Sequence, residues 1–141
     1  MAFWDSSAIV PLCCAQSATL QGRGLLARLG RMVAWWGTTV EALSAFARLV
    51  RDRELNSRQR ATAITLLDQL RRSWDEILPT EAVRAIAESL PDDYGVRAGD
   101  AWQLAAALVW CSERPRGRPF VCLDQRLAEA ASAMGFMVHP N

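Results

Sequence analysis

The residues in this sequence whose types could support chemistry are mainly acids. Four of them directly follow an expected strand or lie in the first turn of an expected helix: Asp5, Glu41, Asp100 and Asp124. In an open α/β sheet, such positions meet beyond the carboxyl ends of the strands. We therefore expect these four carboxylates to lie close together.

Asp100 draws attention because of the segment that follows it. From Ala101 to Trp110 the only polar side chain is Gln103, so this helix should be buried on nearly all sides. A carboxylate in such surroundings destabilises the fold by several kcal/mol unless it is paired or bound to a cation. The pattern therefore indicates that Asp100 is either paired with another side chain or bound to a cation.

Each acid also has a purely structural explanation. The alternatives are a capping box joining Glu41 to Thr38, an ion pair between Asp100 and Arg97, a helix N-cap at Asp124 and a turn at Asp5. Taken singly, these structural roles are the better explanation of each residue. Taken together they lose force, because four independent caps have no reason to follow this order.

The sequence lacks the residues that several other chemistries need. All sixteen basic residues are arginines, which excludes P-loop and Schiff-base lysine mechanisms. The single histidine, His139, argues against a Ser-His-Asp triad and a histidine metal site. No C-x-x-C spacing occurs, so the cysteines are expected to be reduced, buried and structural: Cys13, Cys14, Cys111 and Cys122.

The elements that must position the acids alternate between strands and helices. Strands are expected at residues 2–4, 32–36, 76–78, 119–123 and 136–139. Helices are expected at residues 6–15, 18–29, 38–51, 57–74, 80–89, from about 98 to 112, and 125–134, with a turn at 90–95. The first and third of these helices have serine or threonine caps available, Ser6 or Ser7 and Thr38 or Thr39. This alternation predicts an α/β fold of one domain, residues 1–141, with a central parallel sheet of four to five short strands flanked by helices.

The sequence resembles the PIN-domain ribonucleases, specifically the VapC-type toxins of bacterial toxin–antitoxin pairs. Four stretches carry the resemblance over nearly the whole chain: "WDSSAIVPL" with Asp5, "TTVEALSAFARL" with Glu41, "RAGDAWQLAAAL" with Asp100 and "FVCLDQRLAEAASAMGF" with Asp124. Two positions depart from the family pattern. Gln103 stands where the family often has histidine, and Cys122 where it usually has threonine or serine.

The resemblance implies a PIN-like fold and a metal-dependent endoribonuclease that acts as the toxin of a type II toxin–antitoxin pair. It implies that Asp5, Glu41, Asp100 and Asp124 are both the catalytic and the metal-binding residues. One or two Mg²⁺ or Mn²⁺ ions would relieve the repulsion among four carboxylates. It further implies an RNA substrate, a homodimer, and a cognate antitoxin whose C-terminal segment offers an arginine to the acids.

Two other functions stay open from the sequence. The chain could be a catalytically weakened PIN-fold binding or regulatory module, for which Cys122 is the best hint, or a housekeeping RNA-processing nuclease. RNA contacts are not legible, because the net charge is only +1. Three arginine clusters could attract phosphates, but a solvated surface is the better explanation of each: positions 48–53, 71–72 and 114–118. The tryptophans at 4, 102 and 110 are expected in the core, whereas those at 35, 36 and 74 are interface candidates. For Trp35, however, a place in the core is the simpler interpretation.

Neither a signal-peptide pattern nor an apolar run approaching the ~20 residues of a membrane span is visible. We therefore expect a cytoplasmic protein with no membrane partner.

Overall fold

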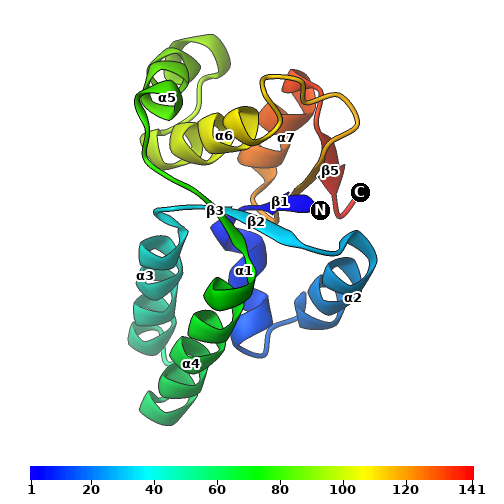
Figure 1. Ribbon diagram of the computed structural model, residues 1–141. Coiled ribbons are helices and arrows are strands. Elements are labelled where there is room, and N and C mark those ends of the chain that lie inside the picture. The colour runs from blue at the N-terminus through cyan, green and yellow to red at the C-terminus, as the bar shows by residue number, and fades with distance from the viewer.

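A five-stranded, entirely parallel sheet forms the centre of the fold (Figure 1). The computed structural model describes all residues, Met1–Asn141. The strands lie in the order β3-β2-β1-β4-β5, and their bounds are Ala2–Trp4 (β1), Met32–Trp35 (β2), Asp75–Ile77 (β3), Pro119–Val121 (β4) and Met137–His139 (β5). The first strand is central, and later strands add on both of its sides. The predicted α/β class, with a parallel sheet of four to five short strands flanked by helices, is confirmed.

Helices cover both faces of the sheet in two separate layers, seen below and above it in Figure 1. The lower layer contains α1 (Ser6–Cys13), α2 (Thr19–Leu29), α3 (Thr38–Arg51) and α4 (Ser57–Ser73). The upper layer contains α5 (Glu81–Tyr94), α6 (Ala98–Trp110) and α7 (Gln125–Met134). This arrangement is consistent with the PIN-like fold that the sequence predicts.

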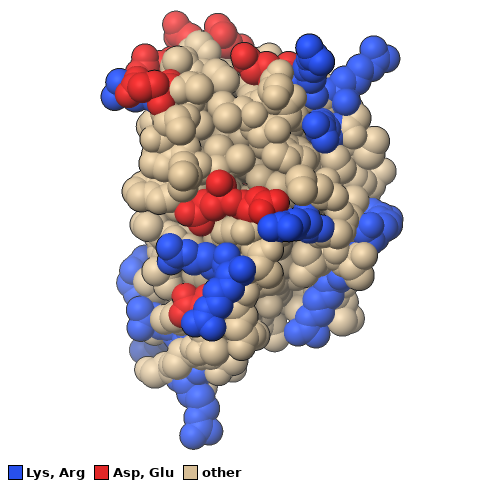
Figure 2. Space-filling view, viewed as in Figure 1, with Lys and Arg blue, Asp and Glu red and all other residues tan.

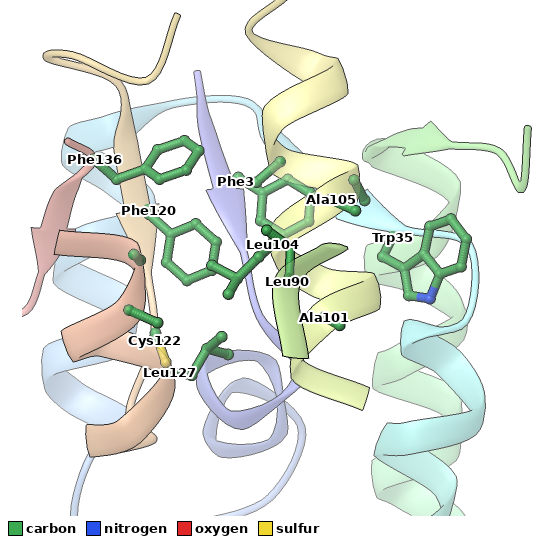
Figure 3. Close-up of a cluster of buried hydrophobic side chains, with 14 of the residues drawn as sticks. Phe3, Trp35, Leu90, Ala101, Leu104, Ala105, Phe120, Cys122, Leu127 and Phe136 are labelled. Atoms are coloured by element: carbon green, nitrogen blue, oxygen red, sulfur yellow. The ribbon is translucent and has the colours of Figure 1, made fainter. Parts of the chain in front are cut away.

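The three central strands, β2, β1 and β4, are buried on both faces, because their side chains alternate between the two helical layers. Phe3 packs with α5, α6 and α7 in one apolar cluster, whereas its neighbours Ala2 and Trp4 pack with α1 to α4 in another. Figure 3 shows the first cluster, in which Phe3 and Phe120 stack with ring centroids 5.4 Å apart. Apolar packing thus covers both faces of the sheet, and the polar side chains lie where the strands begin and end.

One helix is longer than the sequence suggests. The segment expected as a turn, Leu90–Gly95, continues α5 as far as Tyr94, with Pro91 inside the helix. Leu90 is only 3% exposed, so its burial in the core favours continuing the helix despite the backbone hydrogen bond that proline cannot donate. The helix ends one residue later, where Gly95 takes a left-handed conformation with φ of 65°.

The other boundaries lie within a few residues of those expected, but two caps differ. Asp5, rather than Ser6 or Ser7, caps α1, because its side chain accepts a hydrogen bond from the Ser7 backbone. No side chain caps α3, whose N-cap is Gly37. Ser6, Ser7 and Thr38 are therefore free for other contacts, described below.

The tryptophans divide differently from the sequence prediction. Trp4 is fully buried as expected, and Trp35, at 6% exposed, lies in the core, which was the simpler interpretation for it. Trp74 is also only 6% exposed, so its side chain is not available for an interface. Trp36 alone of the interface candidates is exposed, at 52%. Trp102 and Trp110, expected in the core, are half-buried against it.

All four cysteines are free thiols, and three of them are buried, with Cys14 half-buried. No helix combines the length and the apolar character that crossing a membrane would require.

Candidate active site

The four predicted acids share one pocket at the carboxyl ends of the strands. The pocket has a volume of about 470 Å³ and is lined by Asp5, Ser6, Ser7, Val40, Glu41, Ser44, Ala45, Arg48, Asp100 and Asp124. Two larger hollows, of about 670 and 600 Å³, lie along α1 and the α3–α4 connection and contain none of these four acids. The chemistry of the lining, not the size, therefore singles out the acid pocket. The catalytic and metal-binding roles of the four acids stay predictions.

Asp5 follows β1 directly and is almost completely enclosed, with 3% of its surface exposed. Its Oδ2 accepts hydrogen bonds from the backbone N–H of Ser7, at 3.0 Å, and from the Ser7 hydroxyl. Burial raises the pKa of Asp5 from 3.8 to about 6, and repulsion from Glu41 adds to this shift, while the Ser7 hydrogen bonds oppose it. Asp5 thus caps α1 and also presents a destabilised charge to the pocket.

Glu41 is held by two side chains from distant parts of the sequence. Its Oε2 accepts a hydrogen bond from the Ser6 hydroxyl at 2.8 Å, and its Oε1 accepts one from Gln103 Nε2 at 3.3 Å. The capping box with Thr38 does not form, because Thr38 instead accepts a hydrogen bond from the same Gln103 amide at 3.2 Å. Burial first, and repulsion from Asp100 second, raise the pKa of Glu41.

Asp100 lies in the first turn of α6 and is half-buried. It makes no ion pair with Arg97, which excludes the simplest structural explanation for this acid. Its pKa is raised by burial and by repulsion from Asp124, and is lowered to a smaller extent by a hydrogen bond from the Arg97 backbone and by the charges of Arg97 and Arg126. Asp100 lines the pocket at the start of the apolar helix α6 and is not enclosed among apolar side chains.

Asp124 has a structural role as well as a place in the pocket. It is the N-cap of α7, and its Oδ1 accepts a hydrogen bond from the Leu127 backbone at 3.0 Å. The N-cap alternative is therefore correct for this residue. Its Oδ2 makes no hydrogen bond within the protein, so the cap uses only one of the two carboxylate oxygens.

The four carboxylates repel one another without any cationic partner. The protein contains three ion pairs, and none of them involves Asp5, Glu41, Asp100 or Asp124. Asp5 is repelled by Glu41, Glu41 by Asp100, and Asp100 by Asp124, so electrostatic coupling connects all four. Such a site gains stability from a cation.

The donor set fits a hard divalent cation that keeps part of its water shell. All four acids supply oxygen atoms, which Mg²⁺ and Mn²⁺ prefer. No three of the acidic, cysteine or histidine side chains converge closely enough to enclose an ion by themselves. Mg²⁺ dehydrates reluctantly and commonly binds through one or two carboxylates with several waters. An open site of this kind is therefore compatible with Mg²⁺ coordination.

Cys122, the departure from the family pattern, lies beside Asp5. Its Sγ lies 3.9 Å from Asp5 Oδ2 and donates a hydrogen bond to the Asp124 carbonyl at 3.2 Å. Burial, with repulsion from Asp5, raises the pKa of this thiol to about 12, so it remains protonated at neutral pH. Cys122 therefore contributes a weak, uncharged donor where a hydroxyl would be stronger.

Sequence reasoning missed the polar residues that hold the acids. Ser6 and Ser7 were expected as caps but bind Glu41 and Asp5, and Thr38 binds Gln103. Arg48, considered from the sequence as one member of an arginine cluster that could contact RNA, lines the pocket. The sequence did contain a signal for these contacts. Ser6 and Ser7 directly follow Asp5, and Thr38 and Arg48 lie on the same side of the helix as Glu41.

No family model matches the sequence, and no curated protein matches it. Among solved structures, the chain is similar to one in the crystal structure of FitAcB from Neisseria gonorrhoeae, with a TM-score of 0.64 and 19% sequence identity. The match covers 98% of this chain and 96% of that one. At this identity the likeness concerns the fold, and it shows that the whole chain adopts the architecture of that protein.

Proposed function

We propose that this protein is a metal-dependent endoribonuclease that hydrolyses RNA phosphodiester bonds and acts as the toxin of a type II toxin–antitoxin pair. The observation that carries the proposal is the acid pocket, in which four carboxylates repel one another and none has an ion-pair partner. A fold has no need of such an arrangement for stability. The resemblance of the four surrounding sequence stretches to VapC-type toxins supports the choice of RNA as substrate.

In this proposal a bound Mg²⁺ or Mn²⁺ would supply an activated water and would stabilise the charge that develops on the phosphate. Asp5, Glu41, Asp100 and Asp124 would hold one or two such ions, each bound through one or two carboxylates and several waters. Ser6 and Gln103 fix the two oxygens of Glu41, and Ser7 fixes Oδ2 of Asp5. These hydrogen bonds orient the carboxylates before metal and substrate arrive, which is the role that outer partners play in metal sites.

The direct test is cleavage of single-stranded RNA by purified protein in Mg²⁺, in Mn²⁺ and in EDTA. Glu41→Gln, purified in parallel, controls for contaminating nucleases, because the amide keeps the shape of the side chain and removes its charge. We expect cleavage only with metal and only by the parent. Cleavage that persists in EDTA, or equally in Glu41→Gln, would contradict the proposal.

A metal-binding measurement separates the site from its activity. Binding to the folded state alone raises stability by about 2.7 kcal/mol at a metal concentration one hundred times the Kd. We expect the melting temperature to rise with millimolar Mn²⁺ in the parent and to rise less in Glu41→Gln. A melting curve that ignores Mn²⁺, together with no heat of binding, would count against an intact site.

The toxin role requires an inhibitory partner. An acidic pocket suits a guanidinium, which pairs with carboxylates through two hydrogen bonds. We propose an antitoxin whose C-terminal segment places an arginine among the four acids, and a toxin that forms a homodimer. A product of the neighbouring gene that co-purifies and inhibits cleavage would support this role, whereas cleavage with no such inhibitor would favour a housekeeping RNA-processing nuclease.

Cys122 favours one alternative, a PIN-fold binding or regulatory module with weakened turnover. Its thiol replaces a hydroxyl beside Asp5 and stays protonated. If the thiol limits catalysis, Cys122→Thr should increase cleavage severalfold without changing RNA affinity. If the protein binds RNA and neither parent nor Cys122→Thr cleaves it, the binding-module alternative is the correct one.

A further inference from the structure

One cationic residue lines the acid pocket, and it is not used to neutralise the acids. Arg48 lies on α3, on the same side of the helix as Glu41. Ser44, Ala45 and Arg48 follow Glu41 by three, four and seven residues, which places all four side chains along the pocket. Its side chain is exposed, forms no ion pair and makes no hydrogen bond within the protein. A guanidinium beside four carboxylates that pairs with none of them is available for another anion.

The helical layer that carries Arg48 has a net positive charge, whereas the opposite helical layer has a net negative charge. Residues 1–74, which include α1 to α4, contain ten arginines and five acids, a net charge of +5. Residues 75–141 contain six arginines and ten acids, a net charge of −4. Figure 2 shows one face, with arginines spread over the lower half and acids gathered at the top over α5; other arginines lie at the upper right, and other acids lie at the centre.

The arginines of the basic layer are also unpaired. None of those on α2, α3, α4 and the α3–α4 connection has a carboxylate within ion-pair distance: Arg23, Arg28, Arg48, Arg51, Arg53, Arg58, Arg60, Arg71 and Arg72. The overall charge of +1 hides this segregation. A polyanion would therefore meet an attractive surface on one side of the acid pocket and a repulsive one on the other.

We propose that Arg48 is a substrate-positioning residue that binds an RNA phosphate adjacent to the one held at the four acids, so that the strand enters along α3 over the basic layer. This inference rests on the proposed function for the identity of the ligand. Seven residues of α-helix separate the backbones of Glu41 and Arg48 by about 10 Å, which suits a neighbouring phosphate better than the reacting one. A guanidinium binds phosphate oxygens through two parallel hydrogen bonds, which would set the register of the strand.

The binding test uses a fluorescently labelled single-stranded RNA oligonucleotide in EDTA, on an Asp100→Asn background that prevents cleavage. Adding Arg48→Gln should weaken binding about tenfold at low salt, the loss typical of one charge-assisted hydrogen-bonded contact. It should also reduce the slope of log affinity against log salt by about 0.7, the value for one phosphate contact on a single strand. Arg48→Lys should restore most of the slope but only part of the affinity.

Arg116→Gln is the matched control, because it removes the same charge from an exposed, unpaired arginine before β4, at the opposite edge of the sheet. It should change affinity and slope less than half as much as Arg48→Gln. Equal losses in both variants would show a general charge effect and would overturn the proposal. So would an unchanged affinity in an Arg48→Gln protein whose melting temperature matches that of its parent.

A kinetic measurement in Mn²⁺, without the Asp100 substitution, distinguishes positioning from chemistry. Arg48→Gln should raise KM about tenfold and leave kcat nearly unchanged, because the contact is made equally in the ground and transition states. A loss in kcat alone would overturn the assignment. If the protein never cleaves RNA but binding still depends on Arg48, the proposed nuclease function fails while this inference stands.

Discussion

The two ends of the sheet differ in how they treat charge. We call the end where the parallel strands begin the amino edge, and the end where they finish the carboxyl edge. At the amino edge, two arginines have partners: Arg31 contacts Asp75 at 2.6 Å, and Arg118 lies over the ring of Trp110 at 5.2 Å. At the carboxyl edge, four carboxylates lie together with no ion pair, and burial and mutual repulsion raise the pKa values of three of them. The amino edge is arranged for stability, whereas the carboxyl edge carries charges that lower stability until a cation binds. Substitutions at the two edges should therefore have opposite consequences for activity and stability.

The largest effect should come from Asp100→Asn. The amide nearly preserves the shape of the side chain but removes a metal ligand and one negative charge, so cleavage should be abolished. Because the substitution also removes repulsion with Glu41 and Asp124, the melting temperature in EDTA should be no lower than that of the parent. A fully active variant that melts at a lower temperature would show instead that Asp100 has only a structural role.

The pH dependence of stability should reveal the enclosed charge of Asp5. An acid whose pKa is raised from 3.8 to about 6 binds its proton more tightly in the folded state, so metal-free protein should gain stability as the pH falls from 7 toward 4. The gain should approach about 2–3 kcal/mol. His139, whose pKa is lowered by burial, acts in the opposite direction on acidification, so the parent must be compared with Asp5→Asn.

The stability difference between the parent and Asp5→Asn should be largest above pH 6 and shrink below it. Asparagine is an equally good N-cap, so the cap of α1 is retained in the variant. Denaturant unfolding in EDTA at several pH values measures this difference. A gap that is constant with pH would mean that Asp5 does not titrate in the folded protein.

Gln103→Met should have a smaller effect that separates orientation from ligation. Methionine fills the buried space but cannot donate to Glu41 or Thr38, so Glu41 loses one of its two side-chain partners. Loss of such an outer partner typically weakens metal affinity or activity by about 10- to 100-fold. Stability should change little, because the buried Oε1 of Gln103 has no hydrogen-bond partner and its removal compensates for the lost bonds.

Gln103→His provides the complementary measurement for the same position. The imidazole has an N–H donor, and histidine is the residue that the resembled family often has there. We expect it to recover part of the metal affinity that Gln103→Met loses. If both variants bind Mn²⁺ as tightly as the parent, Gln103 does not orient Glu41.

The smallest effect should come from the amino edge. The Arg31–Asp75 pair joins two side chains that are 60% and 42% exposed, and such pairs contribute about 0.2–1 kcal/mol. Arg31→Gln should therefore lower stability by no more than this amount and leave cleavage unchanged. Denaturant unfolding tests the predicted stability, and RNA cleavage by the same preparation tests the predicted activity. A large loss of cleavage would invalidate the contrast between the edges.

Local patterns were sufficient to predict the architecture. The apolar strands, the helices between them and the position of each acid after a strand or in a first helical turn are visible over a few residues, and all four acids reach one pocket. The end of α5 was predicted wrongly, because Pro91 is a strong local signal but the burial of Leu90 depends on residues elsewhere in the fold. A local rule fails where packing outweighs it.

By itself, the sequence determined the layered α/β fold and the gathering of four carboxylates, because strand alternation and strand-end positions depend on neighbouring residues. Only the tertiary structure decided how those carboxylates are held. Ser6 lies 35 residues from Glu41, and Gln103 lies 62 residues from it, so no periodicity connects them. The same holds for Arg48, whose place in the pocket follows from the packing of α3 beside the strand ends. Hydrogen bonds between distant segments exist only once apolar packing has placed the helices, and for that reason they could be read only from the folded chain.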